Sequence, residues 1–396
     1  MFPRQPMKST PAPADATRSA TLVVFTAVFI DLVGFGIVLP LLPSYAARFH
    51  VSDASIGMLV ASFSLMQFVF APRWGRLSDR IGRRPVLLSG LAGSALSYLL
   101  LAIAPSFFVL LLSRLVAGAM GATVSVAQAY LADVTPPERR SRAMGFIGAA
   151  FGLGFVVGPA IGGISSQWGH AAPGYVASAL CASNFLLAWF RLPETRVHVP
   201  FVKPALTSRW KGMAAPYGVM AFSTIAFTVM YVVFPLHIER ELGYDRRHAA
   251  YFFVLIGLVT AAVQGGLVGR LAPRFGDRKL MLTGCVLLAL GLSALPFAYV
   301  TGVPVAWRLP ALLGALLLLA FGPGLVGPSV TGYVSRISTA EEQGRALGTL
   351  TSVGAVARIV GPMMAGTLNG IGGARTAFLA SAGAAALAAL SALALE

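Results

Sequence analysis

The chain has 396 residues, of which 57% are hydrophobic and 11% charged, and its mean hydropathy is +0.77. A soluble core of this size could not hide so much apolar surface, so lipid must be the solvent for much of it. The formal net charge is +16, but the basic residues fall in short connections between apolar runs and form no single patch for nucleic acid. The composition therefore excludes a soluble domain and a nucleic-acid-binding protein, and it indicates a polytopic membrane protein.

The first segment, residues 1–19, is polar and rich in proline. It precedes an apolar run of full span length that has no small-residue cleavage site after it. We therefore expect a short disordered cytoplasmic tail and not a signal peptide.

A membrane span needs about 20 predominantly apolar residues. Twelve runs of this kind follow the tail. They lie near residues 20–44, 55–74, 86–104, 106–131, 143–166, 172–190, 213–236, 248–270, 279–300, 309–333, 345–368 and 374–395. The sequence thus predicts an all-α membrane protein with twelve transmembrane helices.

The connections between the runs differ strongly in charge. With the amino terminus inside, the cytoplasmic segments hold 22 Lys and Arg residues and the outer loops hold six. Because Lys and Arg are retained on the cytoplasmic side, this asymmetry places both termini in the cytoplasm.

A long internal repeat divides the chain. The ten residues 75–84, GRLSDRIGRR, return 194 positions later as GRLAPRFGDR, with six identities. A second repeat, offset by 203, relates Arg142, Gly158-Pro159 and Gly163 to Arg345, Gly361-Pro362 and Gly366. We therefore predict two six-helix bundles related by pseudo-symmetry, residues 20–192 and 213–396, joined by a cytoplasmic linker over 193–212.

The first span carries Asp31 within a D-x-x-G-x-G-x-x-x-P-x-x-P pattern that continues through Gly34, Gly36, Pro40 and Pro43. Asp31 is about 11 residues into the span, roughly 16 Å deep at 1.5 Å per residue. It is the one acid of fourteen near mid-membrane. An unpaired carboxylate there costs several kcal/mol, so we expect a proton, a cationic substrate or a partner to neutralise it.

The connection after span 2 combines glycines with five arginines and the acid Asp79. Glycines allow a tight turn, and the arginines would by themselves hold this segment in the cytoplasm. The second copy keeps the glycines and most arginines but has Pro273 in place of the acid. Because retention needs only the arginines, the acid of the first copy indicates a further role.

Span 4 contains a buried arginine, Arg114, about eight residues from its outer end and therefore roughly 12 Å below the surface. In a core about 30 Å thick this is nearly the depth of Asp31. The two groups could meet directly or through water, so that Arg114 adjusts the proton affinity of Asp31. A permanent salt bridge between spans 1 and 4, or a role in folding or insertion, are the alternatives.

Span 5 contains GAAFGLGFVVGPAIGG from Gly148 to Gly163. Small residues let helix backbones approach one another, and Pro159 bends the helix. Span 11 repeats Gly361-Pro362 but has Arg358 where span 5 has Phe155.

Together these four motifs resemble the major facilitator superfamily, and within it the twelve-span drug/proton antiporter branch that includes the tetracycline exporters. The resemblance covers essentially the whole chain. It implies a solute site between the two bundles near the midplane and transport by rocking of the bundles around it.

The resemblance also implies roles for particular residues. Asp79 would face the amino-terminal end of span 11, and Arg83 would pair with Asp133, which together latch the outward-facing state. The residues expected in this latch are Gly75, Asp79, Arg80, Gly82, Arg83 and Asp133. The span 5 pattern would form a hinge against the other bundle, although ordinary close helix contact explains it too. The residues expected in the hinge are Gly154, Gly158, Pro159, Gly162, Gly163, Gly361 and Pro362.

Several polar and aromatic residues within spans are candidates to line a substrate cavity. They are Phe35, Gln67, Gln128, Asn184, Tyr231, Tyr333 and Arg358. Hydrogen bonding between helices, or aromatic contact with lipid and neighbouring helices, are common alternatives. Arg358 has no acid of comparable depth in its own half, so it would meet an anionic or carbonyl-rich substrate, or cap carbonyls near the Pro362 bend.

No GxxxxGK[ST] loop and no HExxH or GxSxG motif occurs in the chain, so we expect neither an ATPase nor another enzyme. The leading hypothesis is a monomeric, proton-coupled exporter of small amphipathic compounds in the cytoplasmic membrane, with a proton gradient and no cofactor as its energy source. Asp31 would bind the proton and Arg114 would modulate it. A metabolite importer or facilitator of the same superfamily, and a non-transporting receptor or scaffold, remain open.

Overall fold

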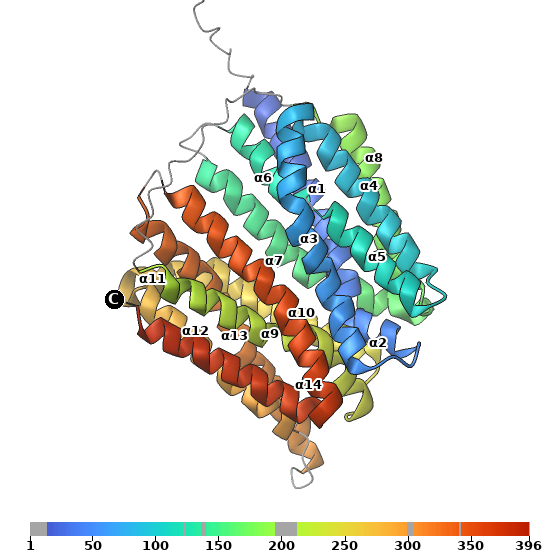
Figure 1. The fold of residues 1–396 in the computed structure, drawn as a ribbon, viewed down its shortest axis with the longest axis vertical. Helices are drawn as coiled ribbons and strands as arrows, with labels where there is room; N and C mark the ends of the chain where they lie inside the picture. The colour runs from blue at the N-terminus through green and yellow to red at the C-terminus, as the bar shows by residue number, and fades with distance from the viewer. Residues whose placement is uncertain are drawn as a thin grey trace, which may run out of the picture.

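The computed structural model describes residues 14–121, 123–135, 140–194, 212–298, 304–339 and 342–395. All regular structure among these residues is helical (Figure 1). Most of the predicted amino-terminal tail and of the predicted linker lies outside the described residues. The described part is an all-α membrane protein, as the sequence predicts.

The first half runs from α1 to α8. Its elements are α1 Ala14–Val38, η1 Leu39–Leu41, α2 Leu42–Ala47, α3 Asp53–Ile81, α4 Arg83–Ala102, α5 Phe107–Met120, α6 Thr123–Val134, α7 Arg140–Ser165, η3 Ser166–Trp168 and α8 Ala172–Arg191. Within this half α1 packs on α7 and α8, and α4 packs on α5 and α8.

The second half runs from α9 to α14. Its elements are α9 Ala214–Arg240, α10 Arg246–Ala262, the π-helical turn η4 Val263–Leu267, α11 Val268–Phe275, α12 Asp277–Ala294, η5 Leu295–Phe297, α13 Val305–Ile337 and α14 Gln343–Leu393. Here α9 packs on α14, and α12 packs on α13 and α14.

Ten helical segments in the described part are long and apolar enough to cross a membrane. One of them, Arg345–Leu393, has 49 residues, more than twice the length of one crossing. It bends at Gly373, whose φ of 72° is not helical. The 26-residue α7 is not among the ten, and several of its side chains lie outside the described part. A multi-pass membrane protein is therefore clear, while the count of twelve stays a prediction.

The structure breaks span 4, which the sequence predicts as one continuous run. The helix stops at Met120, and the next residue, Gly121, has a non-helical ψ of 33°. Backbone groups at membrane depth must find partners inside the protein. Gln67 Nε2 donates to the Gly121 carbonyl at 2.9 Å, and Trp74 Nε1 donates to the Ala119 carbonyl at 2.6 Å. Side chains of α3 thus satisfy the backbone that the break leaves open.

The segment after span 2 is also more helical than expected. Gly75 lies inside α3, with open space where a side chain would be, so it makes no turn. The turn into α4 falls on Gly82 alone, whose φ is 106°. Its counterpart Gly276, with a φ of 77°, makes the same turn between α11 and α12. A positive φ is the conformation for which glycine is required.

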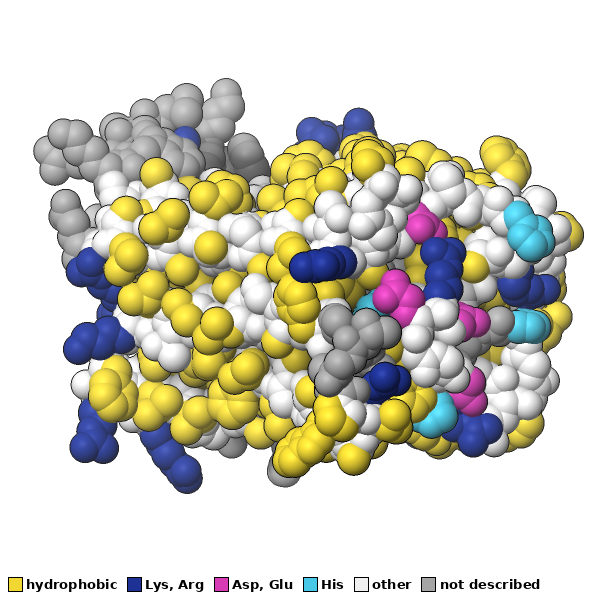
Figure 2. Space-filling model, turned by 90° about the horizontal axis from the view of Figure 1, so that it is seen from below, with side chains coloured by type: hydrophobic (Ala, Val, Ile, Leu, Met, Phe, Trp, Pro, Cys, Tyr) yellow, Lys and Arg dark blue, Asp and Glu magenta, His cyan; other side chains and the backbone are white. Residues whose placement is uncertain are grey.

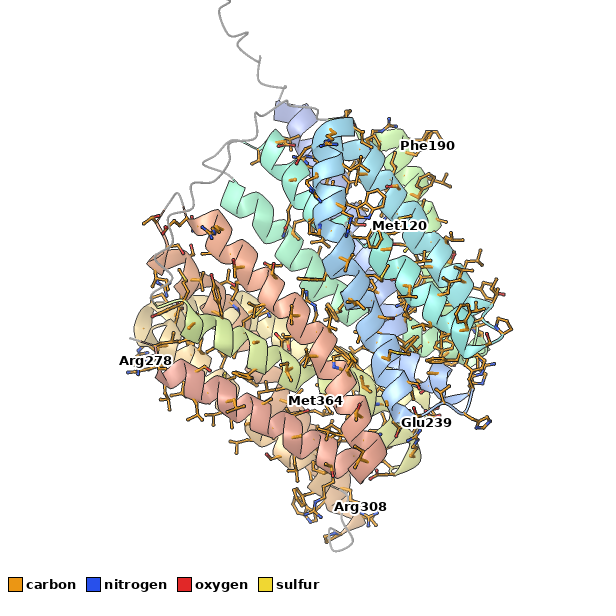
Figure 3. All side chains as sticks on the ribbon, in the orientation of Figure 1. Met120, Phe190, Glu239, Arg278, Arg308 and Met364 are labelled. Atoms are coloured by element: carbon orange, nitrogen blue, oxygen red, sulfur yellow. The ribbon has the colours of Figure 1, made fainter. Side chains whose placement is uncertain are left out.

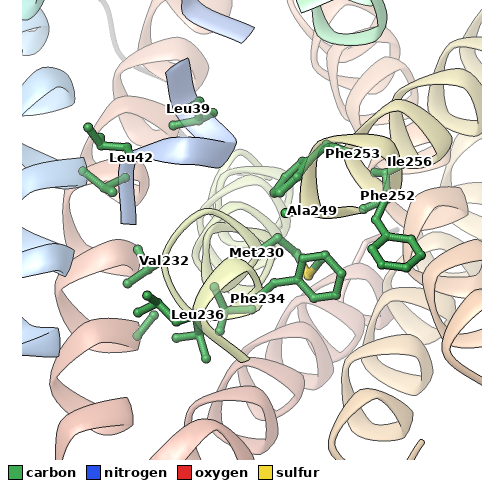
Figure 4. Close-up of a cluster of buried hydrophobic side chains, with 14 of the residues drawn as sticks. Leu39, Leu42, Met230, Val232, Phe234, Leu236, Ala249, Phe252, Phe253 and Ile256 are labelled. Carbon is green, nitrogen blue, oxygen red and sulfur yellow. The ribbon is translucent and has the colours of Figure 1, made fainter. Parts of the chain in front are cut away.

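The two halves meet through α3 with α14 and through α7 with α10. In Figure 1 the blue-to-green helices of the first half lie beside the yellow-to-red helices of the second, and α14 crosses next to α3. One buried cluster contains side chains of both halves, among them Leu39 and Leu42 with Met230, Phe234 and Phe253 (Figure 4). This cluster adds apolar contact between the halves around η1, α2, α9 and α10.

Charged residues mark the two ends of the helices. Glu239 lies where α2 and the start of α3 approach α9 and the bend of α14, whereas Arg278 lies at the opposite end (Figure 3). We call the first end, which also contains Asp53, the Asp53 face, and the opposite end, which also contains Arg83, the Arg83 face. Figure 2 shows Asp, Glu and His side chains together with Lys and Arg toward the right, and Lys and Arg alone at the left edge, with much yellow apolar surface between.

Candidate functional site

Asp31 lies midway along α1, half-buried between α1 and α4. Ser94 Oγ donates a hydrogen bond to Asp31 Oδ1 at 2.7 Å. Thr123, at the start of α6, lies beside the same carboxylate, but its hydroxyl is not within hydrogen-bond geometry. No cation lies at ion-pair distance from Asp31 in the described part of the chain. A neutral hydroxyl is thus the main partner of this carboxylate.

Arg114 is 1% exposed and lies on α5. Its guanidinium carbon is 5.6 Å from the centroid of the Tyr98 ring, a cation–π arrangement. Its Nε and Nη2 have no hydrogen-bond partner among the described residues. Tyr98 lies beside both Asp31 and Arg114. The structure therefore brings the two predicted residues to one region around Tyr98, without the direct salt bridge that the sequence left open.

Near Asp31, α1 is in close contact with its neighbouring helices. A side-chain carbon on Gly34, one turn after Asp31, would lie 3.0 Å from the Tyr98 ring and 3.1 Å from Cys181 Sγ. On the other side, a carbon on Gly158 would lie 2.7 Å from both the Gly36 Cα and the Val33 carbonyl. Larger residues at these glycines would push α1 away from its neighbours. The glycine pattern of spans 1 and 5 thus sets the position of Asp31.

The predicted hinge residues of α7 face two ways. Gly154, Gly158 and Gly162 lie against α1, whereas a side-chain carbon on Gly163 would lie 2.8 Å from Ala250 of the other half. Pro159 lies inside α7, which stays helical through it. In α14, Gly361 lies against α9 and the Pro362 carbonyl lies against Gly57 of α3. The contacts fit both close helix contact and a hinge, and the hinge stays a prediction.

Arg83 joins several groups at the Arg83 face. Its Nε donates to Asp133 Oδ2 at 3.0 Å, and its Nη1 lies 2.6 Å from Ser78 Oγ and 2.5 Å from Asp79 Oδ1. The pairing of Arg83 with Asp133 implied by the resemblance is therefore present. Asp79 is 58% exposed, so it is not buried against the start of α14.

Glu194 is a member of this cluster that the sequence reasoning missed. Its Oε1 accepts hydrogen bonds from the backbone N–H groups of Arg83 at 2.9 Å and Arg84 at 3.5 Å. A carboxylate there satisfies free donors at the amino end of α4 and complements the helix dipole. The same carboxylate leaves no room for a side chain on Gly82. The signal available in the sequence is that Glu194 is an acid directly after span 6.

The second half has an ion pair in the corresponding place, with the charges exchanged. Arg336, at the end of α13, pairs with Asp277, at the start of α12. Asp277 stands 194 positions after Arg83, and Arg336 stands 203 positions after Asp133. Comparison of the two loop copies for identical residues shows only the loss of the acid at Pro273. Applying both repeat offsets to the charged residues would have found the exchanged pair.

At the Asp53 face, polar contacts cross between the halves. Asp53 accepts two hydrogen bonds from Arg240, at 3.1 and 3.2 Å, and one from Asn369 Nδ2 at 2.8 Å. Ser44 Oγ donates to Glu239 Oε2 at 2.7 Å. We call these five residues the Asp53 gate. Arg240 lies 187 positions from Asp53 along the chain, and nothing local in the sequence indicates this partner.

Two of the predicted cavity residues are engaged with neighbouring helices. Gln67 donates to the Gly121 carbonyl, and Asn184 Nδ2 donates to the Ala27 carbonyl at 2.8 Å. Gln128 is exposed on α6. These contacts fit the alternative, hydrogen bonding between helices, because unpaired backbone carbonyls within the membrane are costly. A place for Gln67 and Asn184 on a cavity wall stays a prediction.

The aromatic candidates divide between the halves. Phe35 contacts the rings of Phe63 and Phe155, with centroids 5.1 and 6.0 Å apart. Tyr333 is half-buried against a cluster near the Arg83 face. Tyr231 is half-buried on α9, and Arg358 of α14 lies within electrostatic range of it.

We predict that the exchanged pair stabilises the second half. Arg336→Ala would leave the carboxylate of Asp277, which is 4% exposed, without its partner, and should lower stability by about 1–2 kcal/mol. The measurement is thermal unfolding of the purified protein in detergent. Arg270→Ala, at an exposed arginine of α11, is the matched control.

A double variant in which the two charges exchange places provides a second test of the pair. The double variant Asp277→Arg with Arg336→Asp should recover most of the stability that Arg336→Ala loses, because the pair is rebuilt with the polarity of Arg83 and Asp133. Equal unfolding temperatures for Arg336→Ala and Arg270→Ala would show that the pair contributes nothing.

The chain is similar in sequence to known membrane proteins. The family model described as Major Facilitator Superfamily matches residues 24–307 and 217–396. The class E tetracycline resistance protein of Escherichia coli is 35% identical, covering 87% of this chain and 86% of the relative. The class B protein of the same organism is 30% identical, covering 87% of each.

Solved structures show the same fold. The crystal structure of the human organic anion transporter MFSD10 (TETRAN) superposes with a TM-score of 0.71 at 26% identity. The match covers 96% of this chain and 100% of that structure. These similarities point to a transporter and not to an enzyme. The chain is a membrane transporter that belongs to the major facilitator superfamily and resembles its tetracycline exporters.

Proposed function

We propose that the protein is a proton-coupled antiporter that exports small amphipathic compounds by alternating access. The observation that carries this proposal is the carboxylate of Asp31, half-buried within α1 with Ser94 as its hydrogen-bond partner. Keeping a carboxylate charged at membrane depth is costly without a cation. Protonation removes that cost, so Asp31 can take up a proton in one state and release it in another.

Arg114 has a separate part in this proposal. It is held over Tyr98 with two guanidinium nitrogens unpaired. A small movement of α5 against α4 would bring these nitrogens toward Asp31 and favour its charged form. We therefore assign to Arg114 the release of the proton, and not a permanent salt bridge.

The charge asymmetry of the connections supports the orientation. The Arg83 face would lie at the cytoplasm and the Asp53 face outside, with both termini inside and the protein in the cytoplasmic membrane. With this orientation the structure is closed to the outside by the Asp53 gate and by the apolar cluster around Leu39 and Met230. It would represent the inward-facing state.

The same orientation gives the Arg83 cluster its role. Because Asp79 is largely exposed here, the latch would be released in this state. In the outward-facing state Asp79 would meet the free N–H groups at the start of α14, where a negative charge is stabilised. Arg83, held by Asp133, would keep Asp79 in position for that contact.

Three further assignments concern the energy source, the number of chains and the cargo. The energy source would be the proton gradient, with no cofactor, and one chain would be enough because both halves are present in it. The cargo would be a small organic molecule, as the names of the tetracycline resistance proteins and of the human organic anion transporter suggest for those proteins.

We predict that Asp31→Asn abolishes coupling. Because the amide cannot bind or release a proton, uptake of radiolabelled tetracycline into proteoliposomes driven by a pH gradient should fall by about tenfold or more. Exchange of tetracycline without a gradient should persist. Asp245→Asn, at an exposed acid before α10, is the control. Full gradient-driven uptake by Asp31→Asn would refute the proton role.

We also predict opposite effects of the gate and the latch on the state of the transporter. Ile56 is fully buried at the Asp53 face, so an Ile56→Cys variant without Cys181 and Cys285 reports opening to an impermeant maleimide. Arg240→Gln removes a contact that closes this face and should raise the labelling rate several-fold. Asp79→Ala weakens the latch and should lower it.

The control for this measurement is Arg48→Gln, at an exposed arginine between α2 and α3. It removes the same charge from the same face without touching the gate. Labelling rates that are equal for Arg240→Gln, Asp79→Ala and Arg48→Gln would contradict both assignments.

A further inference from the structure

Arg358 is a charged group that the proposed mechanism does not use. It is half-buried on α14 and makes no hydrogen bond or ion pair within the part of the chain that the structure describes. The alternative left open by the sequence, capping of carbonyls near Pro362, is not formed. A guanidinium partly removed from water gains when an anion pairs with it.

An aromatic cluster that includes Tyr231 lies within electrostatic range of this guanidinium. Tyr231 of α9, which is within electrostatic range of Arg358, stacks on Phe253 of α10 with centroids 6.0 Å apart and planes 13° apart. Phe227 meets the edge of Tyr231 at 5.5 Å and 86°. Such rings offer flat apolar contact to a planar ligand.

The position of Arg358 is not required by the fold. Its counterpart 203 positions earlier is Phe155, whose ring packs against Phe35 at 6.0 Å. An apolar side chain therefore suffices at this place in the first half. A side-chain carbon on Gly354 would lie 3.0 Å from Met220 Cε and 3.5 Å from Arg358 Nη1, so both side chains approach α14 closely at this glycine.

We propose that Arg358 binds the carboxylate or enolate group of a planar aromatic substrate, whose ring lies against Tyr231 and its neighbours. This inference rests on the proposed export function and names the substrate class of the transporter. A guanidinium can donate two parallel hydrogen bonds to a carboxylate. The first half would then handle the proton at Asp31, while the second half holds the anion at Arg358.

Equilibrium binding to the purified protein tests this proposal without a membrane or a gradient. The probes are 2-naphthoate and 2-naphthamide, which share one ring system and differ in charge. The protein should bind the naphthoate about tenfold more tightly than the naphthamide. Equal affinity for the two probes would overturn the proposal.

Three variants locate the effect. Arg358→Gln should weaken naphthoate binding by about tenfold and leave naphthamide binding within about twofold, which also shows that the variant is folded. Arg358→Lys should recover part of the loss, because the charge returns without the paired donors. The matched control is Arg375→Gln, an exposed arginine on α14 that lies over the ring of Phe297 at 4.9 Å.

The outcomes separate this inference from proton coupling. Unchanged naphthoate affinity in Arg358→Gln, or an equal loss in Arg375→Gln, would refute the anion site. Neither result depends on the direction or the energy source of transport, so failure of the antiport proposal would be seen in the uptake measurements and not here.

Discussion

A polar group inside the membrane is costly unless it finds a partner within the protein, and this constraint organises the structure. The broken backbone after α5 is satisfied by Gln67 and Trp74. Arg114 has an aromatic ring as its neighbour, and the carboxylate of Asp31 has a serine hydroxyl. The first arrangement is fully satisfied and fixes the helices, whereas the other two leave charge without a complete counterpart. Groups of this second kind are suited to change partners during transport.

The two halves share a frame but carry different chemistry. The close contact of α1 with α7 recurs between α9 and α14, and the turn at Gly82 recurs at Gly276. The ion pair beside that turn keeps its place while its charges are exchanged. Within the spans the difference is larger, because the first half has Asp31 and the second half has Arg358. The two halves thus share one frame, and the places where they differ are the residues to which we assign the proton and the substrate.

Local pattern was enough to predict the helical architecture and to place Asp31 and Arg114 in one region, where both lie beside Tyr98. It was also enough to place Arg83 beside Asp133 through the family resemblance. It could not predict the Asp53 gate, because the partners Asp53, Arg240 and Asn369 come from three distant helices. For Gln67 and Asn184 it indicates that hydrogen bonds between helices are an alternative, but only the fold shows which carbonyl lies opposite each amide. Asp277 and Arg336 were predictable from the repeat, but only by comparing opposite charges as well as identical residues.

In the proposed mechanism, substrate and proton bind in exchange through Asp31. The most direct measurement is the proton released when tetracycline is added to the purified protein in weakly buffered detergent solution. The wild type should release about one proton per tetracycline bound, and Asp31→Asn should release none, because the amide has no titrating proton at this site. Equal proton release from both proteins, with binding intact, would contradict it.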